Sequence, residues 1–179
     1  TVSTVGIKGK LKRFLDESDC HIDISMHTPI HEQRRQLMPV EKAMPIAETV
    51  ELLKQYAVFQ RKKVGVSSKE ESPLRGDLAG AAVPHQRRLT FEYTMLKGVN
   101  DTMTHAKELL RLLRGLDCRI NLIRYHRIPD VELQGCDMKT MENFRDYLTA
   151  HGITTTIRAS RGEDIYAACG LLNTKRKAL

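Results

Sequence analysis

Residues 89–96, LTFEYTML, carry the clearest strand pattern in the chain. Phe91 and Tyr93 alternate with threonine and glutamate, and alternation at every second position is typical of a strand with one buried face. The GVND sequence that follows turns the chain, and its Asn100 or Asp101 can cap the next helix. This stretch therefore predicts a strand that leads through a tight turn into a helix.

The next segments repeat the pattern. Apolar residues recur at helical spacing and stop at Gly115, which is a typical helix end. These residues are Ala106, Leu109, Leu110 and Leu113. Residues 118–125, CRINLIRY, are the next expected strand. A strand, a helix and a second strand in this order predict parallel strands joined by a helical crossover.

The N-terminal side shows the same alternation. We expect a strand that ends near residue 7, a helix over 8–17 and a second strand over 21–27. Pro45 stands where a further helix can begin, because proline is favoured in the first helical turn.

The C-terminal side completes it. Asp137 is expected to cap a helix that Gly152 closes, and its residues Met138 and Met141 are expected to fill the core. Residues 153–159, ITTTIRA, are the last expected strand. Five strands that alternate with four helices predict an α/β fold of parallel strands, either a barrel or a doubly wound sheet. In both architectures the chemistry lies at the C-terminal ends of the strands.

Length and composition indicate one soluble domain or a large part of one. The 179 residues contain no apolar run of 18 and begin without the order of segments that marks a signal peptide. We therefore expect no membrane segment. The absence of an initiator methionine suggests a fragment or a processed product. Residues 61–86, rich in Gly, Ser, Pro and charge, are expected to form a flexible surface loop.

Cysteine and histidine spacing offers no metal site. The four cysteines are Cys20, Cys118, Cys136 and Cys169. They lie too far apart for a zinc or iron–sulfur motif, so we expect free thiols in a reducing cytoplasm. His27 and His31 are four residues apart, but Pro29 separates them and no HExxH base is present. We therefore expect no metal ligand in this chain.

The charge is basic and clustered. The formal net charge is +7, with basic groups near residues 8–13, 61–63, 87–88 and 175–177. Such clusters suit a polyanion such as nucleic acid, although a solvated basic surface is the simpler alternative. The chain has no Trp and few aromatic residues, which argues against a platform that stacks single-stranded bases.

Polar residues gather where the expected strands end. Ser3 follows the first strand, Ser25 and His27 the second, His126 the fourth, and Cys169 lies beyond the fifth. Together they suit a polar, anionic or nucleotide-like ligand. Each alone has a simpler explanation, because a serine there commonly caps a helix and most free cysteines are small buried hydrophobes. A cysteine nucleophile paired with a histidine is the enzymatic alternative.

Five ordered motifs carry a family resemblance. They are STVG at 3–6, ISMHTP at 24–29, RQLMPV at 35–40, FEYTMLKGVND at 91–101 and RGEDIYAACG at 161–170. In this order they resemble the radical-SAM adenine-C2 RNA methyltransferases, the family of RlmN and its relative Cfr. The resemblance implies that residues 1–179 are the C-terminal part of a partial (β/α)6 barrel whose N-terminal, cluster-binding part is absent.

The resemblance also implies roles for single residues. The positions that match the family's S-adenosylmethionine contacts, partly through backbone groups, are Ser3, Ser25, Met26 and His27. His126 falls where the family commonly has an asparagine that contacts this cofactor, which is a departure. Cys169 matches the catalytic cysteine that the family converts to S-methylcysteine.

The implied reaction is methylation of adenine C2 in 23S rRNA and tRNA through that S-methylcysteine. In the family, one S-adenosylmethionine methylates the cysteine, and a second is cleaved reductively at a 4Fe–4S cluster, with a reductant such as flavodoxin. The CxxxCxxC motif that binds the cluster is absent from this chain. We therefore expect the chain alone to bind no cluster and to be inactive.

Two other readings remain open. One is a non-catalytic, basic α/β RNA-binding module, and the other is an unrelated α/β-barrel enzyme with a cysteine nucleophile. Half a barrel would also leave an open sheet edge, so self-association through that edge is expected.

Overall fold

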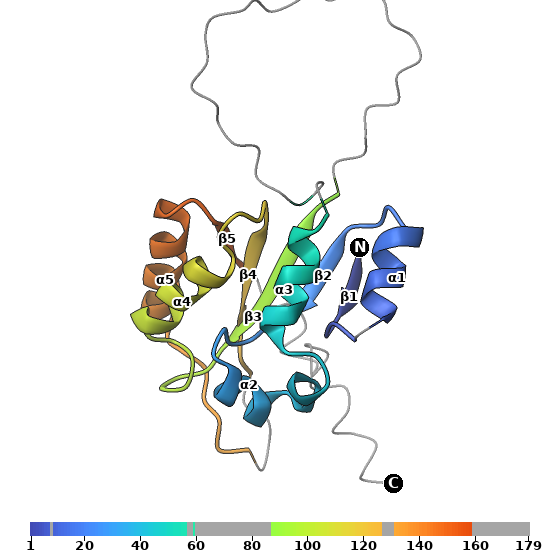
Figure 1. Ribbon diagram of the computed structural model, residues 1–179. Coiled ribbons are helices and arrows are strands. Elements are labelled where there is room, and N and C mark those ends of the chain that lie inside the picture. The colour runs from blue at the N-terminus through green and yellow to red at the C-terminus, as the bar shows by residue number, and fades with distance from the viewer. Residues whose placement is uncertain (8, 57–58, 60–86, 127–130, 159–179) are drawn as a thin grey trace, which may run out of the picture.

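The computed structural model describes residues 1–7, 9–56, 59, 87–126 and 131–158 (Figure 1). The loop expected at 61–86 and the catalytic candidate Cys169 lie outside these ranges.

Five strands form one sheet, and each lies beside its predecessor in the sequence (Figure 1). They are β1 (Val2–Thr4), β2 (Ile22–Ser25), β3 (Leu89–Met95), β4 (Arg119–Arg124) and β5 (Thr154–Arg158). All neighbouring pairs are parallel, which confirms the prediction. The sequential order is that of barrel winding, because the strand order of a doubly wound sheet reverses at a switch point.

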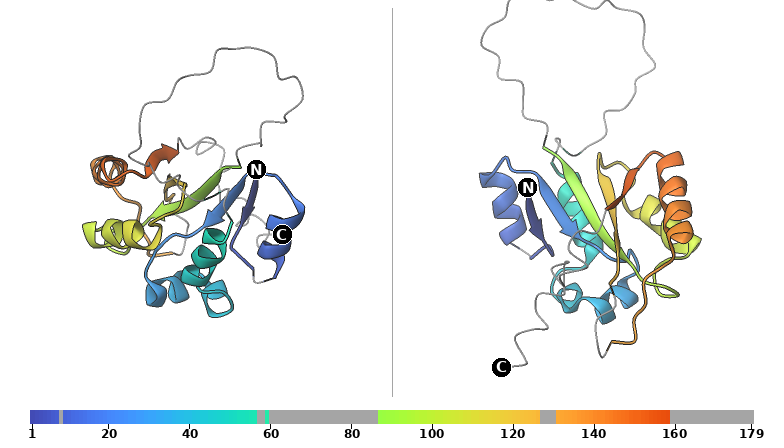
Figure 2. Two further views of the ribbon diagram at one scale, coloured as in Figure 1. Left: turned by 45° about the horizontal axis from the view of Figure 1, so that its top comes forward. Right: turned by 180° about the vertical axis from the view of Figure 1, so that it is seen from behind.

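Helices connect the strands and cover one face of the sheet. The α-helices are α1 (Lys10–Glu17), α2 (His31–Leu37), α3 (Ile46–Lys54), α4 (Met103–Leu112) and α5 (Met138–Ala150), and a short 3₁₀ helix, η1, spans Pro39–Lys42. In the right view of Figure 2, which shows the molecule from behind, β3 lies in front of α3. Because parallel crossovers are right-handed, sequential winding puts successive helices on the same face. In the described ranges no helix is long and apolar enough to cross a bilayer.

The sequence pattern does not predict α2 and η1. The α2 sequence, HEQRRQL, has no apolar stripe, and the residue that it buries is a charged one, Arg34. Hydrophobic periodicity therefore cannot predict this helix, because hydrogen bonds and charge hold it in place and not an apolar face.

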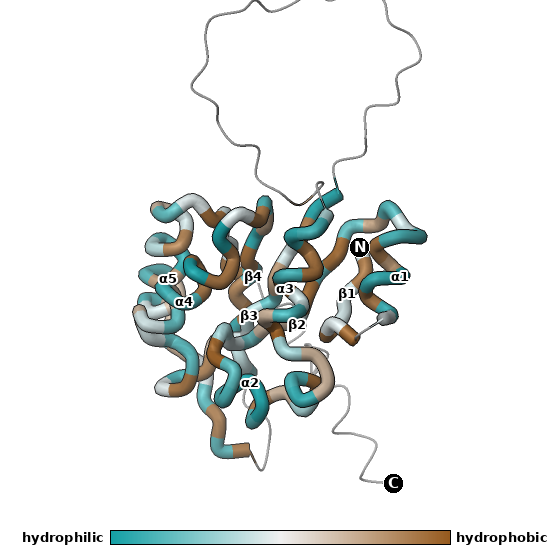
Figure 3. Tube along the Cα trace, in the orientation of Figure 1, coloured by the Kyte–Doolittle hydropathy of each residue, from teal (hydrophilic) through white to brown (hydrophobic). Residues whose placement is uncertain are grey.

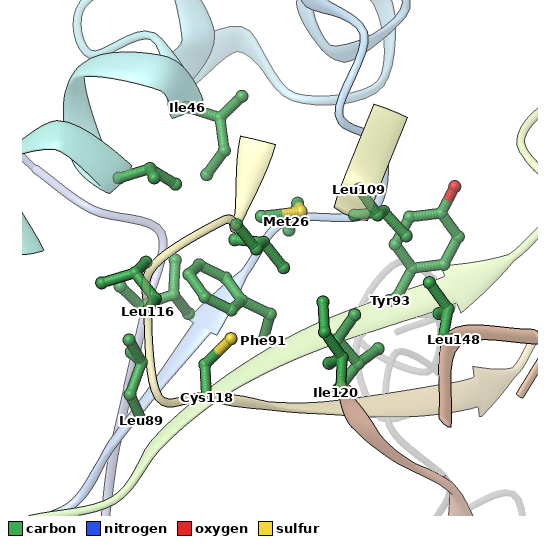
Figure 4. Close-up of a cluster of buried hydrophobic side chains, with 14 of the residues drawn as sticks. Met26, Ile46, Leu89, Phe91, Tyr93, Leu109, Leu116, Cys118, Ile120 and Leu148 are labelled. Atoms are coloured by element: carbon green, nitrogen blue, oxygen red, sulfur yellow. The ribbon is translucent and has the colours of Figure 1, made fainter. Parts of the chain in front are cut away.

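The core lies between the sheet and the helices. Alternate strand residues such as Phe91, Tyr93 and Ile120 are 0% exposed, which follows from the two-residue period of a strand (Figure 4). In Figure 3 polar and apolar residues alternate along the helices, as expected of helices with one apolar side. Cys118 and Cys136 are buried, whereas Cys20 is exposed.

The predictions for the helix α5 are confirmed in part. Asp137 caps α5 as predicted, and its side chain accepts a hydrogen bond from Thr140 N. Met141 is fully buried, but Met138 is 48% exposed, because it lies at the first position of the helix, before the turn that packs on the sheet. The prediction for Met138 is therefore wrong.

The predicted cap of α4 is also wrong. The capping position is Thr102, one residue beyond the predicted pair, and its side chain makes no capping hydrogen bond. Asn100 and Asp101 lie in the preceding turn, where Asp101 accepts the Gly98 N–H at 3.0 Å. The GVND sequence thus shapes the turn and does not cap the helix.

The edge strands are β1 and β5, and within the described ranges each pairs on one side. Association through an open edge stays a prediction.

Candidate active site

The sheet face that points away from the helices carries polar side chains. Ser25, Glu92, Asn121 and Thr156 stand in register on four neighbouring strands and form one row. The Thr156 hydroxyl donates to Asn121 Oδ1 at 2.7 Å. A parallel sheet is normally apolar on both faces, so a polar row of this kind indicates a surface that binds a ligand.

Glu92 is the centre of this polar face. Its carboxylate accepts a hydrogen bond from Ser25 and forms an ion pair with Arg158 Nη1 at 3.4 Å. Partial burial raises the pKa of Glu92, and the nearby Asp23 carboxylate raises it further, while Arg158 and Ser25 act in the opposite direction. The face therefore offers hydroxyls, an amide and both signs of charge, which suits a zwitterionic ligand with hydroxyl groups.

The segment that follows β2 is held tightly by its backbone. The N–H groups of Met26 and His27 both donate to the Glu92 carbonyl, at 3.0 and 3.2 Å. The Met26 carbonyl accepts from Thr28 N at 2.8 Å and from Arg34 Nε at 3.0 Å. The Met26 side chain is 0% exposed and lies in the apolar cluster (Figure 4). Met26 thus anchors the segment from the core side.

A buried ion pair fixes the same segment from the helix side. Arg34 is 0% exposed, pairs with Glu41, and donates to the Ser25 carbonyl at 2.9 Å as well as to that of Met26. Glu41 is 1% exposed and accepts the Ile46 N–H at 3.0 Å, which starts α3. One charged pair therefore ties the end of β2 to η1 and α3.

His27 joins the ends of β2 and β3. Its φ of 59° lies in the left-handed region, which is uncommon for a residue other than glycine. Its Nδ1 accepts the Thr94 N–H at 3.1 Å, and its carbonyl accepts from Asn100 Nδ2 at 2.6 Å. Asn100 also binds the Thr94 carbonyl at 2.8 Å and the Leu96 N–H at 2.7 Å. These bonds stabilise the strained backbone at His27.

The protonation state of His27 follows from these contacts. Burial, followed by the positive charge of Arg34, lowers the pKa of His27 to about 4. The ring is therefore neutral at pH 7. Because Nδ1 accepts a hydrogen bond, the ring proton resides on Nε2.

Ser3 and His126 flank the segment at different distances. Ser3 pairs in register with Asp23, so it shares the polar face with Ser25. His126 follows the end of β4, roughly 10 Å from Ser25 across two strand spacings and about 16 Å further along the strand direction, because Asn121 is the β4 residue in register with Ser25. The structure thus brings Ser3 and Ser25 together and places His126 across β3.

An open cavity of about 450 Å³ lies at the carboxyl end of β4. It is lined by Arg124, Tyr125, His126, Gln134, Gly135 and Cys136. Burial, with the Asp101 carboxylate next in effect, raises the pKa of Cys136 to about 12. This thiol is therefore protonated at neutral pH and is no nucleophile.

The sequence patterns miss two residues that shape the site. Arg34 lies in a polar helix without an apolar stripe, and Asn100 reads as a helix cap. Both act on strand ends that are distant in the sequence. Glu92, in contrast, can be identified from the sequence, because it is a charged residue within the predicted strand 89–96. Among the described residues, no group of three or more His, Cys, Asp or Glu could hold a metal ion.

Similar proteins match nearly the whole chain, although no family model matches it. The probable dual-specificity RNA methyltransferase RlmN of Bacteroides thetaiotaomicron is 55% identical over 177 residues, which are 99% of this chain and 44% of that protein. The dual-specificity RNA methyltransferase RlmN of Marinobacter nauticus is 37% identical over 172 residues, 96% of this chain and 40% of that protein. The chain thus spans less than half the length of these relatives.

Comparison with solved structures points to the same group of proteins. A radical SAM methyltransferase from Sphaerobacter thermophilus has a TM-score of 0.76 at 33% identity, over 95% of this chain and 43% of that one. A domain of pyruvate-formate lyase-activating enzyme from Bacteroides vulgatus shares the fold, with a TM-score of 0.60 at 14% identity over 88% of this chain and 80% of that one. These findings confirm the resemblance drawn from the motifs: over nearly its whole length, this chain is similar to part of the radical SAM RNA methyltransferases of the RlmN kind.

Proposed function

We propose that this chain is the cofactor-facing part of a radical SAM methyltransferase that acts on C2 of adenine in 23S rRNA and tRNA. The observation that carries the proposal is the 55% identity, over 177 residues, to a protein named as a dual-specificity RNA methyltransferase. The polar face around Glu92 supports it, because its groups suit S-adenosylmethionine. RNA substrates of this kind would place the protein in the cytoplasm, and the complete enzyme would use a reductant such as flavodoxin.

Five residues are proposed to contact S-adenosylmethionine: Ser3, Ser25, Met26, His27 and His126. The two serines offer hydroxyls on one face of the sheet, and neutral His27 offers a donor at Nε2. When bound, this cofactor supplies the methyl group and the radical chemistry of the reaction. The surrounding protein holds the contact groups still, because Arg34, Asn100 and the Glu92 carbonyl occupy the backbone groups behind them.

Cys169 is proposed as the methyl carrier, since a thiolate is the side chain that takes up a methyl group as a stable thioether. β5 ends at Arg158, eleven residues before Cys169, and the Arg158–Glu92 ion pair holds that end on the polar face. The sequence has no CxxxCxxC motif. The ligands of a 4Fe–4S cluster would therefore come from the rest of the enzyme, and the chain alone is proposed to be inactive.

Cofactor binding tests the proposal without turnover. Isothermal titration of the 179-residue chain with S-adenosylmethionine should show binding, and Ser25→Ala should weaken it roughly fivefold to tenfold, the value of one hydrogen bond. Thr104→Ala removes an exposed hydroxyl on α4 and is the matched control. No binding by the wild-type chain, or equal affinities for both variants, would contradict the proposed site.

The role of Cys169 has its own test. The chain is produced in a host that contains a complete enzyme of this kind, and its peptides are examined by mass spectrometry. One added methyl group on the Cys169 peptide is expected, and Cys169→Ser should abolish it. Methylation that persists in the serine variant would refute the assignment.

A basic RNA-binding module without chemistry is the second candidate, and the net charge of +7 favours it. Its signature would be tRNA binding that weakens steeply with salt, together with no affinity for S-adenosylmethionine. Cofactor binding together with Cys169 methylation would exclude it.

A further inference from the structure

Gly135 packs directly on the backbone of Tyr125. A Cβ at Gly135 would lie 2.6 Å from the Tyr125 carbonyl oxygen and 3.5 Å from its carbonyl carbon. Among the described residues, the glycines with positive φ are five others, so Gly135 has a backbone that an alanine could adopt. The close approach, and not the conformation, therefore requires a glycine at this position.

The segment that carries Gly135 has little room to retreat. The Gln134 carbonyl accepts the Lys97 N–H at 2.8 Å. Gly135 itself forms an antiparallel bridge with Leu96, directly after β3. Cys136, the next residue, is 6% exposed. The segment is thus fastened to the chain that leaves β3 at Gln134 and at Gly135 itself.

Tyr125 lies on the other side of the contact, and its side chain is not held by a hydrogen bond within the described residues. Its hydroxyl is buried, and no hydrogen-bond partner for it lies in the part of the chain that the structure describes. Its carbonyl belongs to the peptide unit that it shares with His126. Because that unit is planar, pushing the oxygen turns the N–H and Cα of His126 with it.

We infer that Gly135 is a positioning residue that sets where His126 meets the ligand of the 450 Å³ cavity, which both residues line. The inference rests on the proposed function, in which that ligand is S-adenosylmethionine. Gly135 touches the Tyr125 backbone and acts through the His126 peptide unit, so its effect on binding should require the imidazole.

Four variants test this: Gly135→Ala, His126→Ala, the double variant, and Glu132→Ala as an exposed control in the same segment. In amide NMR spectra, Gly135→Ala should shift the resonances of residues 124–126, and the control should leave them in place. Titration with S-adenosylmethionine should show roughly tenfold weaker binding for Gly135→Ala, the loss of one hydrogen bond. In the His126→Ala background the added alanine should have no further effect.

The outcomes separate this inference from the proposed function. Unmoved resonances at 124–126, or an equal loss of affinity with and without the imidazole, would overturn the positioning role. A wild-type chain that does not bind S-adenosylmethionine would remove the proposed function, while the spectra would still decide whether Gly135 positions His126. If Gly135→Ala fails to fold, the NMR spectrum of His126→Ala tests the inference instead. The same coupling should then shift the amide resonance of Gly135, and an unmoved Gly135 resonance would overturn the positioning role.

Discussion

Replacing Glu41 by glutamine should destabilise the fold far more than the same change at an exposed glutamate. Glu41 and Arg34 are 1% and 0% exposed, and Glu41 also contacts His31 Nδ1 at 2.8 Å and Ile46 N at 3.0 Å. Glutamine keeps an oxygen for Ile46 but leaves the Arg34 charge buried without a counter-charge. Breaking a buried pair in this way costs about 3–5 kcal/mol of unfolding free energy.

Glu32→Gln is the matched control, because Glu32 lies in α2 with 71% of its side chain exposed, and its ion pair with Arg35 spans 3.4 Å. Exposed pairs contribute about 0–1 kcal/mol. Equilibrium unfolding in urea, followed by far-ultraviolet circular dichroism, measures both variants, since the chain has no Trp for fluorescence.

The double variant Arg34→Met/Glu41→Gln completes a mutant cycle. It removes the stranded charge, so its cost should fall short of the sum of the single costs by about 1–3 kcal/mol. Equal midpoints for Glu41→Gln and Glu32→Gln, or strictly additive costs in the cycle, would refute the assignment of a stabilising buried pair.

Three further outcomes follow from the same contacts. The pKa of His27 is lowered from 6.5 to about 4 in the folded chain, so the unfolded chain takes up this proton first as the pH falls. The free energy of unfolding should therefore decrease by about 3 kcal/mol as the pH is lowered from 6.5 to about 4. The variant His27→Asn should lack this pH dependence in an acid titration. Asn100→Ala leaves two carbonyls and one N–H near the strand ends without their partner and should cost about 2–4 kcal/mol in urea unfolding. Iodoacetamide at neutral pH should label the exposed Cys20 quickly, whereas Cys136 is buried and its pKa is raised to about 12, so it should react only after unfolding. Peptide masses measure both reactions, and equal labelling rates would contradict the burial of Cys136.

Local patterns predicted the architecture well. The parallel alternation around LTFEYTML and the Asp137 cap both depend on neighbours within a few positions along the chain. A two-residue or 3.6-residue period reports which side of an element is buried, and a cap reports where a helix starts. The family motifs added the candidate contacts Ser3, Ser25, Met26, His27 and His126, which stay predictions.

The tertiary structure decided what holds those contacts in place. Arg34 and Asn100 bind carbonyls at the ends of β2 and β3, and Gly135 packs on Tyr125 across ten positions of sequence. No periodicity marks these residues, because their partners are adjacent in space and not in sequence. By itself, the sequence determined the order of strands and helices, since that order follows from local burial patterns. The fold alone decided which polar residues support the strand ends, since long-range hydrogen bonds and close packing exist only after the strands have met.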